Sequence, residues 1–297
     1  MTDPRVRAVL RDTGRILGRG DLAGAAGTMT YFAAIAVVPW VLLAVWSLTW
    51  FDGVDSAERT LLRLRVLIPP DMGARPVFDT VVHTGTHLGL LGIVVMLFPA
   101  SFYGEGLRRA CVPMHERSDR LTSWRGRISM MALVVVVPPL TWIHVRVGTL
   151  LVGLSPEGGA DGWGPFALRV WAGFTITWLL LSVVLTWVFR EVTPGKPRWW
   201  VALAGATVTA SFVSGFAQGF LLFLSIGIDI GIPYGGLRVV GGVVAVGLWL
   251  YLMHILIITG WALTQAIDHR DDRAQAAPVS HPDAADDGSP PAAAPSR

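Results

Sequence analysis

Charged residues are scarce in this chain. Only 15% of its 297 residues are Asp, Glu, Lys or Arg, and 53% are apolar, whereas a typical soluble domain carries about 25% charged residues. The single cysteine, Cys111, excludes an intrachain disulfide. Asparagine is absent, a shortage that we connect with no function. Residues 1–19 lack the apolar core of about 7–15 residues that a secretory signal peptide needs, so we expect no such peptide.

Long apolar runs take the place of the missing charge. A run of about 20 apolar residues spans the hydrocarbon core of a bilayer as a helix. The sequence contains six such runs, at roughly 28–50, 81–103, 128–154, 166–189, 199–228 and 237–267. The second is the weakest, because it carries His83 and His87 near its start and Pro99 near its end. We therefore predict an all-α fold, a polytopic membrane helix bundle with six transmembrane helices.

The basic residues are concentrated in alternate connections between these runs. Five precede the first run, six follow the second, and three each follow the fourth and the sixth, which makes 17 of the 24; five lie at the other connections. Since basic residues are enriched in cytoplasmic loops, we expect both termini in the cytoplasm of a bacterial inner membrane. Despite a formal net charge of +3, we expect no nucleic-acid partner, because these arginines indicate topology first and contacts with lipid head groups second.

The two ends of the chain differ from its middle. Residues 4–19 repeat apolar side chains at helical spacing, with arginines on the remaining face. We assign 1–20 to an amphipathic interfacial helix, which lies on membrane lipids and can contact anionic head groups. Residues 21–268 form the six-span membrane domain. The Ala- and Pro-rich segment 269–297 is predicted to be a disordered cytoplasmic tail, and 56–68 a second surface helix on the opposite side.

One face of the fifth run predicts close helix packing. Small residues at four-residue spacing let a neighbouring helix approach closely inside a membrane. These residues are Thr207, Ser211, Gly215 and Gly219.

Several polar or helix-kinking residues within the runs are candidates for a substrate path. They are Tyr31, Pro39, Arg146, Gln218 and His254. Each also has a structural interpretation. Arg146 can extend to the membrane surface, Gln218 can bond an adjacent helix, and His254 can be a hydrogen-bonded histidine of the core instead of a proton relay.

No catalytic or metal-binding motif stands out. His83 and His87 share a helix face, but the pattern of a zinc protease is absent and no third ligand is evident, so we expect no metal and no cofactor. Glu105, Glu116 and Asp119 alternate with arginines, a pattern typical of solvated ion pairs. We expect no enzyme activity.

Three parts of the sequence resemble the YihY/BrkB family of bacterial inner-membrane proteins. They are AAGTMTYFAA at 25–34 with Pro39, the basic turn at 190–200, and YGGL at 234–237 followed by WLYL at 249–252 and Gly260. The resemblance covers roughly residues 5–268 and implies six spans with cytoplasmic termini. The family has been linked to envelope functions, virulence and transport, and some members carried a ribonuclease BN label. Members often have an acidic residue just after the last-span glycine, where this chain has Trp261 and Ala262.

Three functions remain open on this reading. The first is a transporter or lipid- and envelope-handling protein of unknown substrate. The second is a non-transporting envelope scaffold or interaction protein, and the third, more remote, is a ribonuclease. A cavity between the helices would favour the first, and a fully packed bundle would favour the second. The substrate, a coupling ion and the oligomeric state stay undetermined.

Overall fold

The computed structural model describes residues 3–67, 74–115, 122–153, 163–225 and 230–276, and within these ranges it contains helices and no strand. Six helices are long and apolar enough to cross a membrane. They are α2 (Leu22–Asp52), α5 (Leu90–Cys111), α7 (Leu133–Gly153), α8 (Trp163–Trp187), α9 (Trp199–Ser225) and α10 (Arg238–Ala276). The prediction of an all-α bundle with six spans is confirmed, and the chain is a multi-pass membrane protein.

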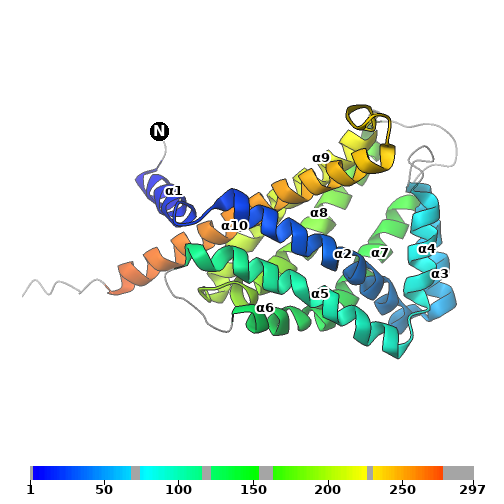
Figure 1. Ribbon diagram of the computed structural model, residues 1–297, viewed down its shortest axis with the longest axis horizontal. Coiled ribbons are helices and arrows are strands. Elements are labelled where there is room, and N and C mark those ends of the chain that lie inside the picture. Colours follow the sequence, from blue (N-terminus) through cyan, green and yellow to red (C-terminus); the bar gives the residue numbers. More distant parts are fainter. Residues whose placement is uncertain (1–2, 68–73, 116–121, 154–162, 226–229, 277–297) are drawn as a thin grey trace, which may run out of the picture.

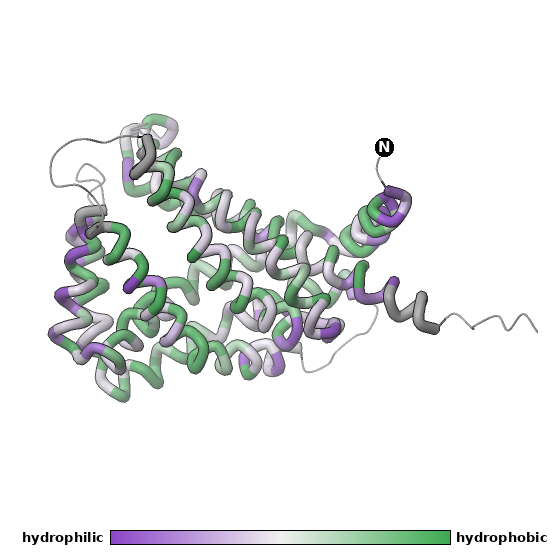
Figure 2. The backbone as a smooth tube through the Cα atoms, turned by 180° about the vertical axis from the view of Figure 1, so that it is seen from behind, coloured by the Kyte–Doolittle hydropathy of each residue, from purple (hydrophilic) through white to green (hydrophobic). Residues whose placement is uncertain are grey.

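Shorter helices complete the structure, most of them at the two ends of the bundle, while α6 (Thr122–Met131) packs along α5 (Figure 1). The others are α1 (Pro4–Leu17), α3 (Val54–Arg63) and α4 (Arg75–Thr86), with single turns η1 (Leu64–Leu67), η3 (Val112–Met114), η4 (Val188–Val192) and η5 (Ile232–Tyr234). We call the end that holds α1 and the close of α10 the arginine-rich end, and the end that holds α3 and α4 the opposite end. Figure 2 shows hydrophilic segments at both ends and mostly hydrophobic chain between them.

The bundle is packed most tightly toward the arginine-rich end. Its main core contains Met29 from α2, Leu107 from α5, Phe189 from η4, and Ile258 and Trp261 from α10, all fully buried. A second, smaller core at the opposite end joins α3 and α4 to α2 and α7; it consists of Val45, Leu48, Ala57, Leu61, Val82 and Val145. The N-terminal helix α1 docks on α10, where Ile16 is buried.

Small residues allow the closest contact between α9 and α10. A Cβ atom added at Gly205 would collide with Thr264, and one added at Gly260 would collide with Thr209. Each helix thus presents a glycine and, four residues later, a threonine to its neighbour. The threonine hydroxyls donate to the carbonyl oxygens of Gly205 and Gly260 in their own helices, at 2.7 and 2.8 Å. The hydroxyls are thereby satisfied without a partner from the other helix.

The stripe predicted from Thr207 to Gly219 lies beside this contact. Gly215 is exposed, and a Cβ added there would touch only Phe174 of α8, at 3.9 Å. One added at Gly219 would lie 3.8 Å from Trp249 of α10. The physical reason is the helical repeat of 3.6 residues, because a strict four-residue spacing drifts by roughly 40° per step around the helix. The closest approach uses Gly205 and Thr209 instead.

Three predicted boundaries differ from the structure. The second span begins at Leu90 and not at residue 81, because α4 ends at Thr86 and Gly89 adopts an extended conformation before α5. His83 and His87 therefore lie outside the span. The run at 128–154 divides at Ala132 into α6 and α7. Helix α10 continues to Ala276, into the segment predicted as a disordered tail; residues 277–297 lie outside the described part of the chain.

Candidate functional site

An apolar cavity of about 280 Å³ lies between α2, α5, α6, α7, α8 and α10. Its lining is formed by Ala33, Ala36, Val37, Trp40, Tyr103, Met130, Leu133, Val137, Val184, Leu250, Met253, His254 and Ile257. No Asp, Glu, Lys or Arg is among these residues. A charged ligand group would therefore find no opposite charge in the cavity.

A second pocket of about 280 Å³ lies between α7 and α8. It shares the lining residues Val137 and Val184 with the first cavity, so the two pockets adjoin; we call them together the apolar cleft and each of them a lobe. Leu140, Leu180 and Leu181 line the second lobe, and its polar groups come from Thr141, His144 and Thr177. The cleft thus extends between α7 and α8 from the middle of the bundle toward its opposite end.

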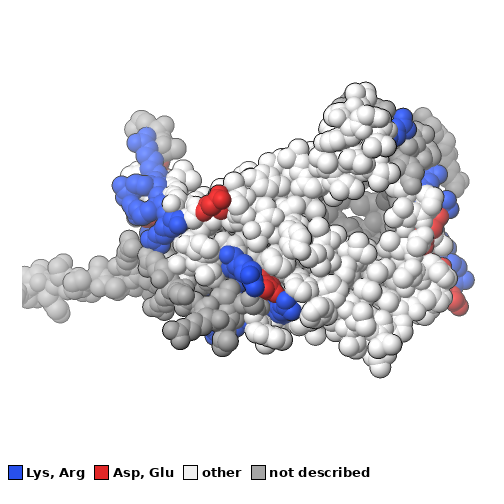
Figure 3. Space-filling model, in the orientation of Figure 1, with Lys and Arg blue, Asp and Glu red and all other residues white. Residues whose placement is uncertain are grey.

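The described residues leave a hollow at this opposite end. Figure 3 shows the surface hollowed between the α9–α10 pair and the α3–α4 pair. The first half of α10 is exposed on several sides, including Val239, Val243 and Leu248. Inside a membrane, exposed apolar side chains contact lipid tails without cost. Val37, which lines the first lobe, is 44% exposed on α2, so apolar chains of the membrane can reach the cleft.

His254 is the buried polar group at the arginine-rich side of the cleft. Its Nδ1 atom lies 3.1 Å from the hydroxyl oxygen of Thr30, and its ring centroid lies 5.9 Å from that of Tyr103. The Thr30 hydroxyl donates to the carbonyl oxygen of Ala26 at 2.8 Å, so its oxygen accepts from Nδ1–H of His254. This assignment follows from the hydrogen-bond network. It leaves Nε2 of His254 as an acceptor.

Among the five residues predicted to line a substrate path, His254 lines the cleft and the other four lie elsewhere. Tyr31 is 65% exposed on the outside of α2, against Phe32. Pro39 is buried in α2 next to Trp40. Gln218 faces α8, with its Nε2 atom 4.0 Å from the position of a Cβ at Gly173. The structure therefore does not bring the predicted set together.

Arg146, the fifth predicted residue, forms an ion pair at the opposite end. Its Nη2 atom donates to Oδ1 of Asp52 at 2.6 Å, and the indole nitrogen of Trp142 lies 3.4 Å from the same oxygen. The Asp52 side chain is only 10% exposed, whereas that of Arg146 is 45% exposed. The arginine thus neutralises a largely buried carboxylate and ties α7 to α2.

Sequence reasoning missed the apolar lining of the cleft. Val137 and Val184, which line both lobes, cannot be distinguished in the sequence from valines that pack in a core. One available signal is Pro138-Pro139, directly after Val137. Two consecutive prolines remove two helical hydrogen bonds and disfavour regular packing at that place.

Comparison with known proteins assigns the chain to a family. A family model described as virulence factor BrkB matches residues 15–284. The chain belongs to the BrkB family. No curated protein and no solved structure was found to match it. The membrane-spanning helices and the cleft all lie within the residues that the BrkB model matches.

In the last span, the motif shared with BrkB proteins ends in a packed position. Gly260 is the glycine against Thr209. Trp261, which follows it, is fully buried and donates its indole N–H to the carbonyl oxygen of Pro194 at 3.2 Å. Gln265, one turn later, donates to the same carbonyl at 3.4 Å. The position after the last-span glycine therefore fixes the turn between α8 and α9 in this BrkB-family chain.

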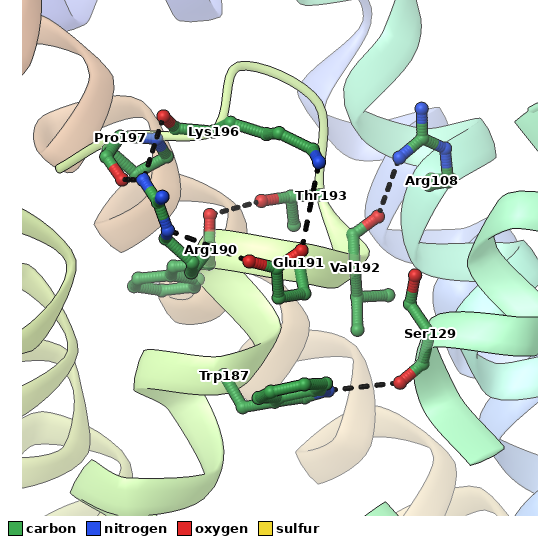
Figure 4. A network of polar contacts seen from close by, with 10 residues as sticks. Arg108, Ser129, Trp187, Arg190, Glu191, Val192, Thr193, Lys196 and Pro197 are labelled. Carbon is green, nitrogen blue, oxygen red and sulfur yellow. Dashed lines mark hydrogen bonds and ion pairs between the residues drawn. The ribbon is translucent and has the colours of Figure 1, made fainter. Parts of the chain in front are cut away.

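Two arginines, one from α5 and one from η4, donate to backbone carbonyls at that turn (Figure 4). Arg108 of α5 is buried and donates to the carbonyl oxygen of Val192 at 3.0 Å. Arg190 donates to the carbonyls of Lys196 and Pro197. The chain forms a single π-helical turn at η4, and such turns leave carbonyl oxygens without regular helical partners. Arg108 supplies such a partner for Val192, and Arg190 binds carbonyls of the connection that follows η4, so this network stabilises the fold.

Glu105 is buried, not solvated as predicted. It is 4% exposed, accepts a hydrogen bond from Arg127 Nε at 2.6 Å and pairs with Arg109 Nη2 at 2.7 Å. The guanidinium of Arg127 also lies 4.1 Å from the centre of the Phe102 ring. The prediction that Glu105 forms ion pairs with arginines is correct, but the prediction that the pairs are exposed to solvent is wrong. Glu116 and Asp119 lie outside the described residues.

A similar pair joins α1 to α10. Arg270 Nε donates to Oδ2 of Asp12 at 2.6 Å. This hydrogen bond lowers the pKa of the Asp12 carboxyl below its usual value of 3.8. The pair is therefore intact at neutral pH, and its contribution to stability is lost only as the pH falls through the lowered pKa.

One group of side chains in the described part of the chain could hold a metal ion. Glu58 of α3 lies beside His83 of α4 and beside His87, which caps α4, and one ligand atom from each falls within 4.8 Å of the others. The expectation that no third ligand lies near the two histidines is wrong. Glu58 was missed because it precedes His83 by 25 residues and lies on another helix.

Proposed function

We propose that this protein binds a lipid-class molecule in the apolar cleft and moves it between the cleft and the surrounding membrane. The observation that carries the proposal is the cleft itself, two adjoining lobes of about 280 Å³ each that are both lined by Val137 and Val184. Ligand pockets bury most of a ligand against side chains of matching polarity. An apolar lining without charge therefore suits an acyl chain or another hydrocarbon group.

A polar solute fits this cleft poorly. Arg146 and Gln218, which a path for polar solutes would use, lie outside it. The polar groups nearest the arginine-rich side are Tyr103 and Nε2 of His254, which can hydrogen-bond one small polar group of a ligand. The substrate class is thus an amphipathic molecule with a large apolar part and a polar part that reaches either His254 or the open end.

The membrane placement follows from the arginine distribution. We infer a bacterial inner membrane with the arginine-rich end in the cytoplasm. In α1, Val6 and Leu10 are 47% and 59% exposed beside exposed arginines, while Ile16 packs on α10. This arrangement supports a helix that contacts both α10 and the anionic head groups of the adjacent leaflet.

A nuclease is a weaker proposal. Metal-dependent cleavage needs carboxylates that can reach a metal ion, and Glu105 is enclosed by two arginines. Glu191 lies 3.6 Å from Arg190 and 3.8 Å from Lys196. We expect that the purified protein does not cleave RNA with or without Mg²⁺.

The proposed function is tested by filling the cleft. Val184 lines both lobes, whereas its neighbour Val183 is 47% exposed on the outside of α8. Val184→Trp should place an indole in the empty space, and Val183→Trp should place it among lipids. In proteoliposomes with a fluorescent phospholipid in one leaflet, wild type and Val183→Trp are expected to increase exchange between leaflets, and Val184→Trp to slow it.

Two results would contradict the proposal. If wild-type protein gives the same exchange as protein-free vesicles, the scaffold alternative becomes the better account. If Val184→Trp moves lipid as fast as Val183→Trp, the cleft is not the path. Thermal unfolding of both variants in detergent controls for damage to the fold.

A further inference from the structure

We infer a divalent metal site of the zinc class at the opposite end of the bundle, formed by Glu58, His83 and His87. His83 Nδ1 lies 3.3 Å from Oε1 of Glu58. The imidazole centroids of His83 and His87 are 4.5 Å apart. Ligand atoms on a tetrahedral zinc ion, each about 2.0–2.1 Å from the metal, lie roughly 3.3 Å from one another. The Glu58–His83 separation already has this value. All three ligand atoms lie within 4.8 Å of one another, so small rotations of the side chains would bring them to the distances of a zinc site.

The backbone under these three side chains is fixed by packing. Each ligand is next in sequence to a buried residue: Ala57 before Glu58, Val82 before His83 and Thr86 before His87, exposed by only 1%, 1% and 2%. Ala57 and Val82 belong to the smaller core that joins α3 and α4 to α2 and α7. The ligands therefore project from a rigid surface, which preserves their separation.

Hydrogen bonding prepares His87 to bind a metal through Nε2. Its Nδ1 atom lies 3.0 Å from the carbonyl oxygen of His83. A carbonyl can only accept, so Nδ1 carries the proton and Nε2 carries the lone pair. Metal-binding histidines usually donate their other ring N–H to a carbonyl or carboxylate in this way.

The donor set selects the metal. Two imidazoles and one carboxylate suit Zn²⁺ and similar first-row ions, whereas Mg²⁺ and Ca²⁺ prefer oxygen ligands. Asp79, one turn before His83 on α4, is paired with Arg65 at 3.3 Å and is not part of the set. Three protein ligands leave a fourth position for water or an anionic group. A bound ion would link α3 to α4 beside the opening of the bundle.

Calorimetric titration with ZnCl₂ tests the site. The full-length protein, stripped with a chelator and carrying no polyhistidine tag, is titrated in detergent micelles. Wild type is expected to bind one Zn²⁺ per chain, with Mg²⁺ giving no signal. His83→Gln, His87→Gln and Glu58→Gln should each weaken binding by at least about tenfold. His269→Gln, which removes a histidine at the other end of the molecule, should bind like wild type.

The inference is overturned if wild type shows no saturable binding of one Zn²⁺, or if His83→Gln and His87→Gln bind as tightly as wild type. A variant that unfolds is recognised by its metal-free thermal unfolding, which should equal that of wild type because these side chains lie at the surface. The visible spectrum of the Co²⁺-loaded wild-type protein gives an independent measurement: four-coordinate Co²⁺ absorbs strongly, and the spectrum of hexahydrated Co²⁺ would contradict the site.

Discussion

At the scale of single residues, buried charges in this chain are compensated by a partner on a different segment. Glu105 is bound by Arg127, Asp52 by Arg146 and Asp268 by Arg198 at 3.1 Å. A charge inside a bundle is costly unless it is paired and hydrogen-bonded. These carboxylates therefore connect α5 to α6, α2 to α7 and α10 to the start of α9.

Replacement of Glu105 should destabilise the protein strongly. Glu105→Gln leaves Arg127 and Arg109 without their carboxylate, and breaking a buried ion pair costs about 3–5 kcal/mol. The matched control is Glu191→Gln, whose side chain is 26% exposed and only loosely paired; it should change stability by about 0–1 kcal/mol. Thermal unfolding in detergent measures both. Equal unfolding temperatures for the two variants would mean that Glu105 is not a buried ion-pair partner in the folded protein.

At the scale of helices, glycines determine how closely the spans pack. Gly205 and Gly260 each let a threonine side chain of the neighbouring helix pack directly against the glycine, and Gly104 lets α5 approach the backbone of Gly126 of α6. Within a membrane, such contacts replace the hydrophobic drive that is missing between helices. Contacts of this kind hold α9 against α10 and α5 against α6, while the apolar cleft remains between the less closely packed α7 and α8.

Leucine substitutions should separate the close contact from the predicted stripe. Gly260→Leu overpacks the α9–α10 contact at a cost of about 1–3 kcal/mol or more. Gly215→Leu has room, because a Cβ there meets only Phe174 at 3.9 Å. We expect reduced accumulation and a lower unfolding temperature for Gly260→Leu and nearly wild-type behaviour for Gly215→Leu. The reverse order would show that the stripe from Thr207 to Gly219 is the main contact.

The sequence was sufficient to predict the helices but not how they pack against one another. Length and apolarity predicted six spans, and helical spacing predicted α1. The boundary before Leu90 failed because Val81 and Val82 are as apolar as a span, although they pack in the small core under α3. The cleft could not be predicted, because Val184 in a cavity and Leu185 in the core have the same chemistry. The metal ligands could not be predicted together, because only the contact between α3 and α4 brings Glu58 close to the two histidines.

At the scale of the whole molecule, both described ends lie at the arginine-rich end, as an even number of spans requires. We predict that this end is cytoplasmic. A reporter fused after Arg198 should then be active in the cytoplasm, and one fused after Ala74 should be active on the outer side. A cytoplasmic signal after Ala74 would contradict the orientation that the arginine distribution predicts.

The most direct test of the central claim is whether the apolar cleft holds a lipid. Native mass spectrometry of the detergent-purified protein, under activation that removes loosely attached lipids, reports what remains bound. The account predicts a retained lipid-class molecule on wild type and on Val183→Trp, and its loss from Val184→Trp, whose indole occupies the space where the two lobes meet. A wild-type protein that carries no such molecule, or a Val184→Trp variant that retains it equally well, would contradict the account.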